Sequence, residues 1–216
     1  MNSTLVHLAA EYDDSEDSSN LLSIVLQYGA DVNEVDAKGW SPLLVANSIQ
    51  KTPFHRLRLL LEWGADLCMP SKFSGIIPRD NTRSEKDIFI EFISLHNPKL
   101  TKLVSSEFGG RRCEVINLPN HPQLNGKACV VEKYIAKKDK YKITFEGSGN
   151  AALVGPNNLK RRDRTPLDCG YYISFKNGKM SRREFATKEE CQAYVTSDSS
   201  SEGVKSTAEG LASFKL

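Results

Sequence analysis

Two stretches of this 216-residue chain repeat the same pattern of residue types. "IVLQYGADVN" covers residues 24–33 and "LLLEWGADLC" covers residues 59–68, so that Gly29 and Gly64 lie 35 positions apart. Repetition at such a period is typical of stacked units, each too small to bury its own apolar face. The first expectation is therefore an array of paired helices, and this expectation constrains the fold more than any other feature.

A second pair of segments extends the repeated unit. "STLVHLAA" at residues 3–10 aligns with "WSPLLVAN" at residues 40–47, a displacement of 37 positions. Pro42 falls in the first turn of a helix, where its missing N–H costs nothing. Gly29 and Gly64 follow the leucines of the next helix, where a left-handed C-cap favours glycine. Each unit is thus predicted to be two helices with a glycine at the end of the second.

These segments resemble the ankyrin repeat, in which a T-P-L-H-x-A-A helix start precedes a helix ending L-L-x-x-G-A-D-V-N and a hairpin finger D-x-x-G. The resemblance implies an N-terminal α-solenoid of two to three repeats. The third repeat is degenerate: "FSGIIP" (73–78) stands where G-x-T-P is expected, and "EKDIFIEFISLH" (85–96) is expected to be its second helix. About three repeats are needed to close a solenoid core, so Leu100 and Leu103 are expected to cover the third.

The fingers of ankyrin folds contact partners. The resemblance therefore implies a set of partner-binding residues, namely Ala37, Lys38, Trp40, Phe73, Ser74 and Ile76. Trp40 admits two interpretations: it is a binding anchor, worth roughly 2 kcal/mol or more on truncation, or it packs on the neighbouring finger. His7 stands at the family's T-P-L-H histidine and is interpreted as a hydrogen-bonding residue that stabilises the turn.

From residue 111 the pattern changes to short β-branched runs such as "KACVVEKYI" and "KYKITF", separated by turn-forming residues. Turn signals every eight to twelve positions predict a compact all-β barrel. The run C-x-V-x-N-L…P-x-L-N-G-K…V-V-x-x-Y…K-Y-x-I-x-F…G-P-N-N-L-K-R resembles the Src-homology-3-like small barrel found beside ankyrin repeats or MYND zinc fingers, and more distantly a KOW barrel. No zinc-finger cysteines accompany it in this chain.

The two halves of the chain differ in charge. Residues 1–98 carry 8 Lys+Arg and 14 Asp+Glu, a net charge of −6, whereas residues 99–216 carry 21 and 13, a net charge of +8. A basic small barrel with interleaved tyrosines can dock phosphates and stack bases. The candidate nucleic-acid-binding residues are Lys133, Tyr134, Lys137, Lys138, Lys140, Lys160, Arg161 and Arg162. Alternatively, lysines on hairpin tips keep strand edges from pairing with other molecules or face a protein.

Residues 170–195, "GYYISFKNGKMSRREFATKEECQAYV", predict a β-hairpin that turns at Asn177-Gly178, followed by a short helix with Thr187 as its N-cap. The order of hairpin and helix is similar to the hybrid-binding N-terminal module of ribonuclease H, but the second aromatic residue and the lysine signature of that family are missing. We therefore expect an α+β extension of the barrel. The Ser-rich residues 196–216 predict a flexible tail.

Motifs of catalysis are missing from the sequence. It contains no nucleophile elbow, P-loop, H-E-x-x-H or dinucleotide glycine run, and its five cysteines are scattered without a C-x-x-C pair. We expect no enzyme activity, cofactor, metal or small-molecule substrate. The acidic N-terminal residues do not resemble a targeting signal, and no apolar run is long enough for a membrane span. The expected location is the cytoplasm or nucleus, with no membrane partner.

The sequence thus predicts an α+β chain of two modules. Residues 1–98 are expected to form ankyrin repeats, 99–110 a linker, 111–165 a Src-homology-3-like small β-barrel, 166–195 a β-hairpin plus helix extension and 196–216 the tail. The expected function is a non-enzymatic protein-protein interaction adaptor or scaffold, a subunit of a larger complex, with one partner at the fingers and a second partner surface on the barrel. The alternative is a regulator that binds RNA or DNA through the basic barrel and is recruited by the repeats.

Overall fold

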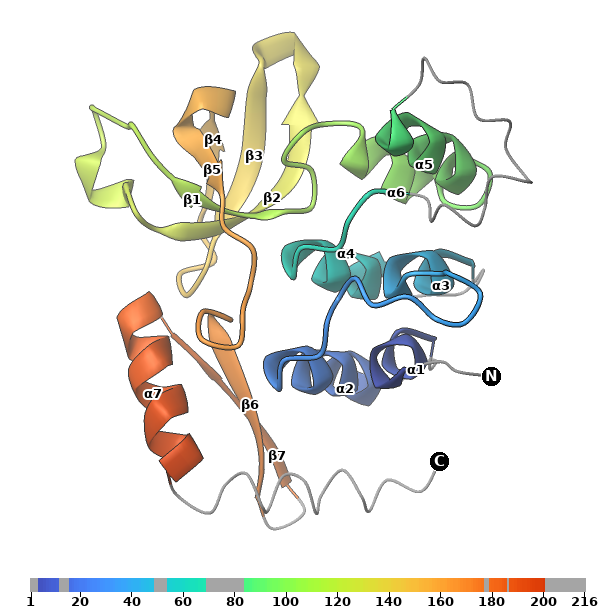
Figure 1. Cartoon of the computed structure of the whole chain (residues 1–216). Coiled ribbons are helices and arrows are strands. Elements are labelled where there is room, and N and C mark those ends of the chain that lie inside the picture. Colours follow the sequence, from blue (N-terminus) through green and yellow to red (C-terminus); the bar gives the residue numbers. More distant parts are fainter. Residues whose placement is uncertain are drawn as a thin grey trace.

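A computed structural model of the chain describes residues 4–11, 16–48, 54–68, 84–176, 179–185 and 187–200. These residues form seven α-helices and two antiparallel sheets (Figure 1). Six helices come first in the chain: α1 (Leu5–Glu11), α2 (Glu16–Gln27), α3 (Pro42–Ser48), α4 (Phe54–Glu62), α5 (Glu85–Ser94) and α6 (Pro98–Val104). None of the helices in these ranges is both long and apolar enough to cross a membrane.

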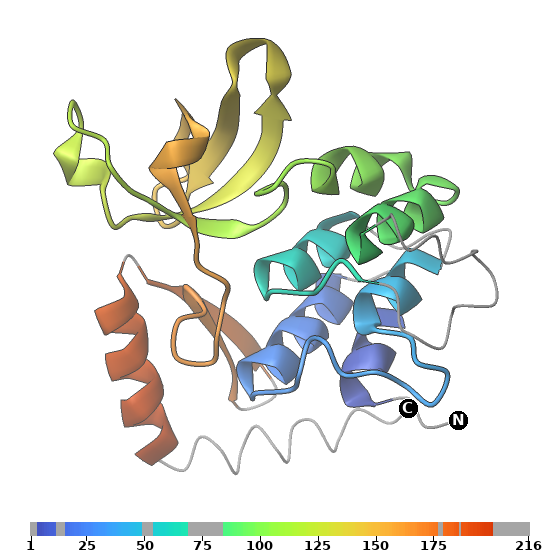
Figure 2. The same cartoon turned by 45° about the horizontal axis from the view of Figure 1, so that its top comes forward.

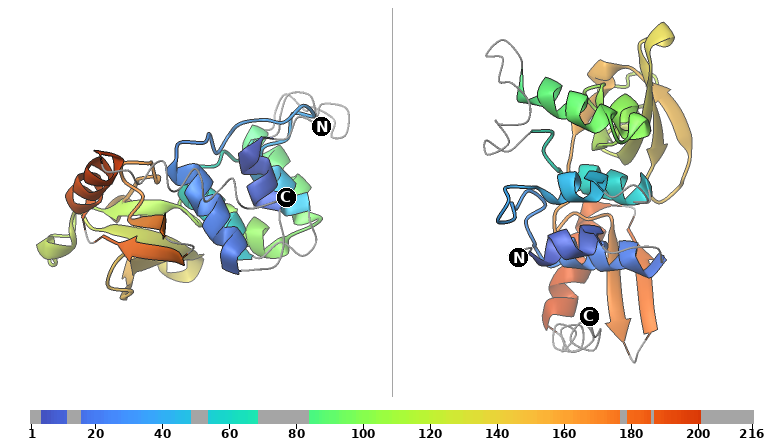
Figure 3. Two further views of the ribbon diagram at one scale, coloured as in Figure 1. Left: turned by 90° about the horizontal axis from the view of Figure 1, so that it is seen from below. Right: turned by 90° about the vertical axis from the view of Figure 1, so that its right-hand side faces the viewer.

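The six helices pack in three pairs, α1 with α2, α3 with α4 and α5 with α6. In the right-hand view of Figure 3 the pairs lie one above another. The predicted glycine C-caps are confirmed, because Gly29 and Gly64 have φ of 89° and 93° two residues after the last residues of α2 and α4. Ala9 and Ala46 are fully buried, and their small side chains allow α1 and α3 to pack closely. Local sequence therefore accounts for where each helical pair ends.

Five strands form the larger sheet: β1 (Arg112–Val115), β2 (Ala128–Ile135), β3 (Lys140–Phe145), β4 (Ala151–Val154) and β5 (Leu159–Arg161). Their order is β4-β3-β2-β1-β5, with every neighbouring pair antiparallel. Alternate residues of these strands face one core, which includes Val115, Cys129, Val131 and Ile143. The register between β2 and β3 shifts after Val131, which is a β-bulge.

The second sheet is a hairpin of β6 (Tyr171–Lys176) and β7 (Lys179–Glu184), followed by α7 (Lys188–Ser200). The predicted N-cap is confirmed, because the Thr187 hydroxyl oxygen accepts a hydrogen bond of 3.2 Å from the backbone N–H of Glu190. The helix extends to Ser200, into the segment expected to be a tail. The rest of that segment and the expected turn at Asn177-Gly178 lie outside the described residues.

The predicted fold class is wrong. The described residues form helices and a five-stranded antiparallel sheet, not a clear ankyrin solenoid followed by a closed barrel. β4 and β5 lie at the two edges of the larger sheet. The helices also share a hydrophobic core with the segment that contains β6, β7 and α7. This core contains Leu26 and Leu60 of the helices together with Tyr172 and Phe185. The hairpin that follows the larger sheet packs beside the helices, where Tyr171 and Ile173 share a small core with Ile24 of α2.

Hydrogen bonds fix β6 on α2, which lie side by side in Figures 1 and 2. The Gln27 side chain donates to the carbonyl oxygen of Ile173 over 3.0 Å and accepts from its N–H over 2.9 Å. The indole N–H of Trp63 donates to the Tyr171 hydroxyl, which in turn donates to Ser23 Oγ over 3.2 Å. Because these groups are buried, each bond replaces one that water would otherwise make. The hairpin therefore has a defined position on the helices.

Candidate partner-binding surfaces

The turn between β2 and β3 and the adjoining strand residues carry five exposed lysines. We call this set, Lys133, Lys137, Lys138, Lys140 and Lys142, the lysine hairpin. Lys133 lies directly opposite Lys142 in the β2–β3 register. The ion pairs found among the described residues involve none of the five lysines. The hairpin therefore presents an excess of positive charge without close ion pairs, although Glu132 lies near enough to Lys142 to be affected by its charge.

Two like charges directly opposite on neighbouring strands are destabilising. The pair of Lys133 and Lys142 thus costs stability instead of adding to it. A cluster of one sign attracts molecules of the other sign and raises their rate of association. An anionic partner is consequently the ligand class that fits the lysine hairpin.

Tyr134 lies beside these lysines, and its contacts support the hairpin tip. Its ring packs on the buried Tyr141 with centroids 4.9 Å apart, and its hydroxyl donates to Asp139 Oδ1 over 2.6 Å. The hydrogen bond to Asp139 raises the pKa of Tyr134. Asp139 lies at the turn itself, with a left-handed φ of 47°. Its hydrogen bond with Tyr134 therefore connects the turn to β2. The base-stacking role expected for Tyr134 would have to use the remaining exposed part of its ring.

The other three basic candidates lie on or just after β5, which β1 separates from the β2–β3 hairpin. Lys160 is exposed. Arg161 donates to Asp163 over 2.8 Å and to the carbonyl oxygen of Gly64 over 3.3 Å. Arg162 donates to both carboxylate oxygens of Asp168, over 2.8 and 3.2 Å. The structure therefore does not join these residues to the lysine hairpin, and both guanidinium groups are engaged within the chain.

The expected finger residues Ala37 and Lys38 are exposed in the loop that joins α2 to α3. Asp36 shapes this loop, since its Oδ1 accepts from the backbone N–H groups of Lys38 and Trp40 over 2.8 and 2.9 Å. Val35, beside them, is 56% exposed. The loop thus presents a small mixed surface. The other expected finger residues, Phe73, Ser74 and Ile76, lie outside the described residues.

Trp40 is half-buried and belongs to the packing of the helices. Its ring meets Phe92 of α5 edge to face, with centroids 6.5 Å apart. Its carbonyl oxygen lies 2.8 Å from Nε2 of His7, whose Nδ1 lies 2.7 Å from the Thr4 hydroxyl. The hydrogen-bonding role expected for His7 is therefore confirmed. These contacts favour the packing interpretation of Trp40, while a role in binding stays a prediction.

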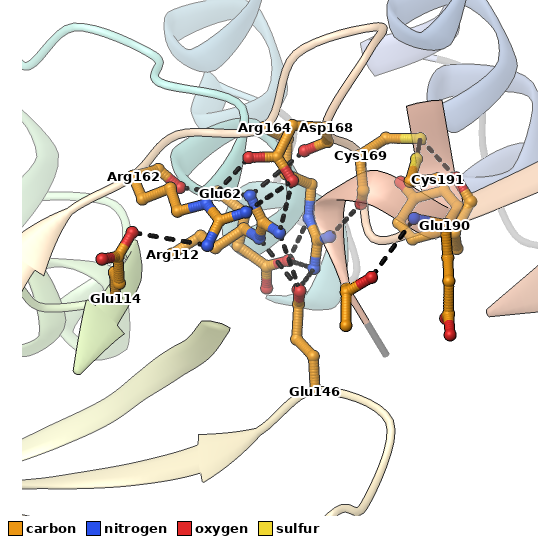
Figure 4. Close-up of polar contacts among 12 residues, drawn as sticks. Glu62, Arg112, Glu114, Glu146, Arg162, Arg164, Asp168, Cys169, Glu190 and Cys191 are labelled. Carbon is orange, nitrogen blue, oxygen red and sulfur yellow. Dashed lines mark hydrogen bonds and ion pairs between the residues drawn. The ribbon is translucent and has the colours of Figure 1, made fainter. Parts of the chain in front are cut away.

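A buried charge network joins α4, β1 and the segment after β5 (Figure 4). We call it the arginine network; its members are Glu62, Arg112, Glu114, Glu146, Arg162, Arg164 and Asp168. Arg112 contacts Glu146 and Asp168 at 3.0 and 3.1 Å, and Arg164 contacts Glu62 and Glu146 at 2.8 and 2.6 Å. The side chains of Arg112 and Arg164 are only 2% and 6% exposed.

The network keeps its members charged. Burial alone would lower the pKa of Arg164, but Glu62 and Glu146 outweigh burial and raise it. Burial likewise opposes ionisation of Asp168, but hydrogen bonds from Arg162 and Arg112 hold its pKa below the ordinary value. The sequence carries one signal of this network, the alternation of Arg and Asp in "RRDRTPLD" at residues 161–168. The basic charge of that run predicts an open surface, whereas the structure buries Arg164 and pairs Arg162 with Asp168.

No three His, Cys, Asp or Glu side chains gather as ligands for a metal ion within the described ranges. Comparison with known proteins adds no relative, since neither a family model nor a curated protein matches the chain. The family resemblances stated from the sequence therefore stay predictions and carry no argument below. The surfaces are assigned a function from their own chemistry.

Proposed function

We propose that the protein is a non-enzymatic adaptor, a subunit of a larger assembly, that binds an acidic protein partner through the lysine hairpin. The observation that carries this proposal is the set of five exposed lysines without ion pairs, two of which face each other across strands. Carboxylates of a partner would relieve the repulsion between Lys133 and Lys142. Complementary charge of this kind orients partners and speeds their association.

The loop between α2 and α3 is the proposed second contact. It presents exposed Val35, Ala37 and Lys38, and the Asp36 side chain holds its backbone in a defined conformation. A stable protein interface covers about 800 Å² per partner. An adaptor that uses both surfaces would bury more area against its partner and bind more firmly.

Nucleic acid is the alternative partner, and two observations favour a protein over it. Binding of single strands usually combines phosphate contacts with aromatic platforms for the bases, whereas the Tyr134 ring packs on Tyr141 and its hydroxyl binds Asp139. Arg161 and Arg162 are engaged in ion pairs within the chain. The basic residues therefore offer fewer free contacts to nucleic acid than the sequence suggested.

The proposed location is the cytoplasm or nucleus. All five cysteines, including buried Cys113 and Cys129, are free thiols, which suits a reducing compartment.

Site-specific photocrosslinking in an extract of the native source tests the proposal. A photoreactive residue at position Lys138 should crosslink to proteins with acidic surfaces, and the same residue at exposed Lys99 of α6 should not give those products. Nuclease treatment of the extract should leave the products at position 138 unchanged. Products that disappear with nuclease, or that are equal at both positions, would contradict an acidic protein partner at this hairpin.

A further inference from the structure

Two buried cysteines face each other where β6 begins and α7 starts. The sulfur atoms of Cys169 and Cys191 are 3.6 Å apart, and both residues are fully buried (Figure 4). Cys169 directly precedes the Gly170 turn into β6, and Cys191 lies in the first turns of α7. Sulfur atoms at van der Waals distance need to approach by only about 1.5 Å to form an S–S bond.

The turn at Gly170 holds this geometry. Gly170 has a φ of 75°, and a Cβ atom there would lie 2.7 Å from Oε2 of Glu146 and 2.9 Å from Nη1 of Arg164. Only glycine therefore fits between the arginine network and the cysteine pair. The buried carboxylate and guanidinium leave Cys169 little freedom to move away from Cys191.

The two thiols differ in their surroundings. The one proton of the Cys169 thiol lies within reach of both the carbonyl oxygen of Tyr171 and the Cys191 sulfur. The hydrogen bond from the Cys169 side chain, together with bonds from the backbone N–H groups of Cys169 and Gly170, lowers the pKa of Cys191 below that of an ordinary thiol. Burial instead raises the pKa of Cys129, in the core of the larger sheet, to about 12. Cys191 is thus the sulfur that ionises more readily, and the thiolate is the reactive form.

A cleft of about 930 Å³ runs beside the pair. Its lining includes Asp168 and Gly170, which flank Cys169, and Thr187 and Lys188 at the start of α7. A small oxidant can therefore come close to the sulfurs through a short local opening, while their complete burial disfavours bulky disulfides.

We propose that Cys169 and Cys191 are a redox-active dithiol that hydrogen peroxide converts to an intrachain disulfide. The Cys191 thiolate attacks one oxygen of the peroxide, breaks the O–O bond and becomes a sulfenic acid, and the departing hydroxide takes up a proton to leave as water. The Cys169 sulfur then attacks the Cys191 sulfur, its proton leaves with the displaced hydroxide as a second water, and the S–S bond forms. The two thiols lose two electrons in total, and one peroxide gains them.

Peptide mapping of the full chain tests the proposal. After treatment with a slight excess of peroxide and alkylation of the remaining thiols, mass spectrometry should find a peptide pair joined through Cys169 and Cys191, and two of the five thiols should be lost. A reductant should restore them. The disulfide should also raise the melting temperature by roughly 5 °C, since it restricts the unfolded chain between residues 22 positions apart.

The pH dependence and two variants complete the test. The rate of disulfide formation should reach its plateau at a lower pH than the oxidation of an ordinary thiol, because the pKa of Cys191 is lowered. Cys113→Ser should leave the product unchanged, and Cys191→Ser should abolish it. The proposal is overturned if wild-type protein yields only sulfinic acid, if peroxide oxidises Cys113 and Cys129 equally fast, or if the rate still rises steeply above about pH 8 as for an ordinary thiol. The wild-type readouts decide the matter even if Cys191→Ser does not fold.

Discussion

Arg164 donates two hydrogen bonds, of 2.8 and 3.0 Å, to a carboxylate oxygen of Glu62, which lies 102 positions earlier in the chain. The backbone N–H of Arg164 also donates to the carbonyl oxygen of Glu62 over 2.9 Å. Three bonds between the same two residues attach the end of α4 to the segment that leaves the larger sheet. This contact shows how the helices and the strands are held together.

Replacement of Arg164 should destabilise the fold strongly. Arg164→Met leaves the carboxylates of Glu62 and Glu146 without their buried cation, and loss of one partner of a buried pair costs about 3–5 kcal/mol. Urea denaturation measures the loss. Arg161→Met is the matched control, because the pair of Arg161 with Asp163 is largely exposed and should contribute less than about 1 kcal/mol. Equal losses in the two variants would contradict the structural role of the arginine network.

The ion pair of Arg58 and Glu132 should make the free energy of unfolding depend on pH in the acid range. The hydrogen bond from Arg58 lowers the pKa of Glu132, and burial opposes it only in part. A lowered folded pKa contributes stability that is present above about pH 4.5 and is lost as the pH falls through the folded value. Wild type should therefore exceed Glu132→Gln in free energy of unfolding at neutral pH, and this difference should shrink as the pH falls below about 4.5.

Denaturation curves at several pH values check this, with exposed Glu107→Gln as the control that keeps the Arg58 pair. The control should follow the wild-type pH profile. A gap between wild type and Glu132→Gln that is the same at every pH would show that the charge on Glu132 is not the cause.

Substitutions of Trp40 and Lys38 test whether residues of the loop between α2 and α3 contribute to packing or only to binding. Trp40→Ala should lower stability by about 1–3 kcal/mol, less than for a fully buried tryptophan, because half of the ring packs on Phe92 and its surroundings. Exposed Lys38→Glu should change stability by less than about 0.5 kcal/mol. Thermal melting distinguishes the two. An unchanged melting temperature for Trp40→Ala would restore the interpretation of Trp40 as an anchor free for a partner.

Lys142→Glu should act in opposite directions on stability and on binding. A glutamate opposite Lys133 turns a repulsive cross-strand pair into an attractive one. The change also removes the attraction between Lys142 and Glu132, so the net stabilisation of the hairpin should lie at the lower end of the range for cross-strand pairs, about 0.2 kcal/mol. The same change should weaken capture of an acidic peptide. Lys127→Glu, outside the lysine hairpin, should do neither. If Lys142→Glu weakened folding and binding together, the loss of binding would reflect damage to the hairpin.

Local features of the sequence predicted local features of the structure. Gly29 and Gly64 mark the ends of helices because a left-handed φ is a property of single residues. Thr187 as an N-cap depends only on the next three positions. Four of the five lysines of the lysine hairpin were among the residues singled out from the sequence, because charges at a turn have few neighbours to pair with.

Contacts between distant residues could not be predicted in this way. Gln27 belongs to the expected outer helix, and its partner Ile173 lies 146 positions away, so no periodic pattern connects them. For the same reason the repeated segments predicted the helical pairs but did not predict that the hairpin of β6 and β7 packs against them. Arg161 and Arg162 are different, since their carboxylate partners Asp163 and Asp168 lie only two and six positions away. Their basic charge alone predicted free surface, although the nearby Asp residues indicated these pairs.

The most direct test of the account is the binding of two labelled probes, a glutamate-rich peptide and a mixed-sequence RNA, as a function of salt. Wild type should bind the peptide more tightly than the RNA at low ionic strength. Affinity should fall as salt screens the charges, and Lys137→Glu with Lys138→Glu should abolish binding at an unchanged melting temperature. Tighter binding of RNA, or peptide binding that survives both the salt and the double substitution, would contradict the lysine hairpin as a site for an acidic protein.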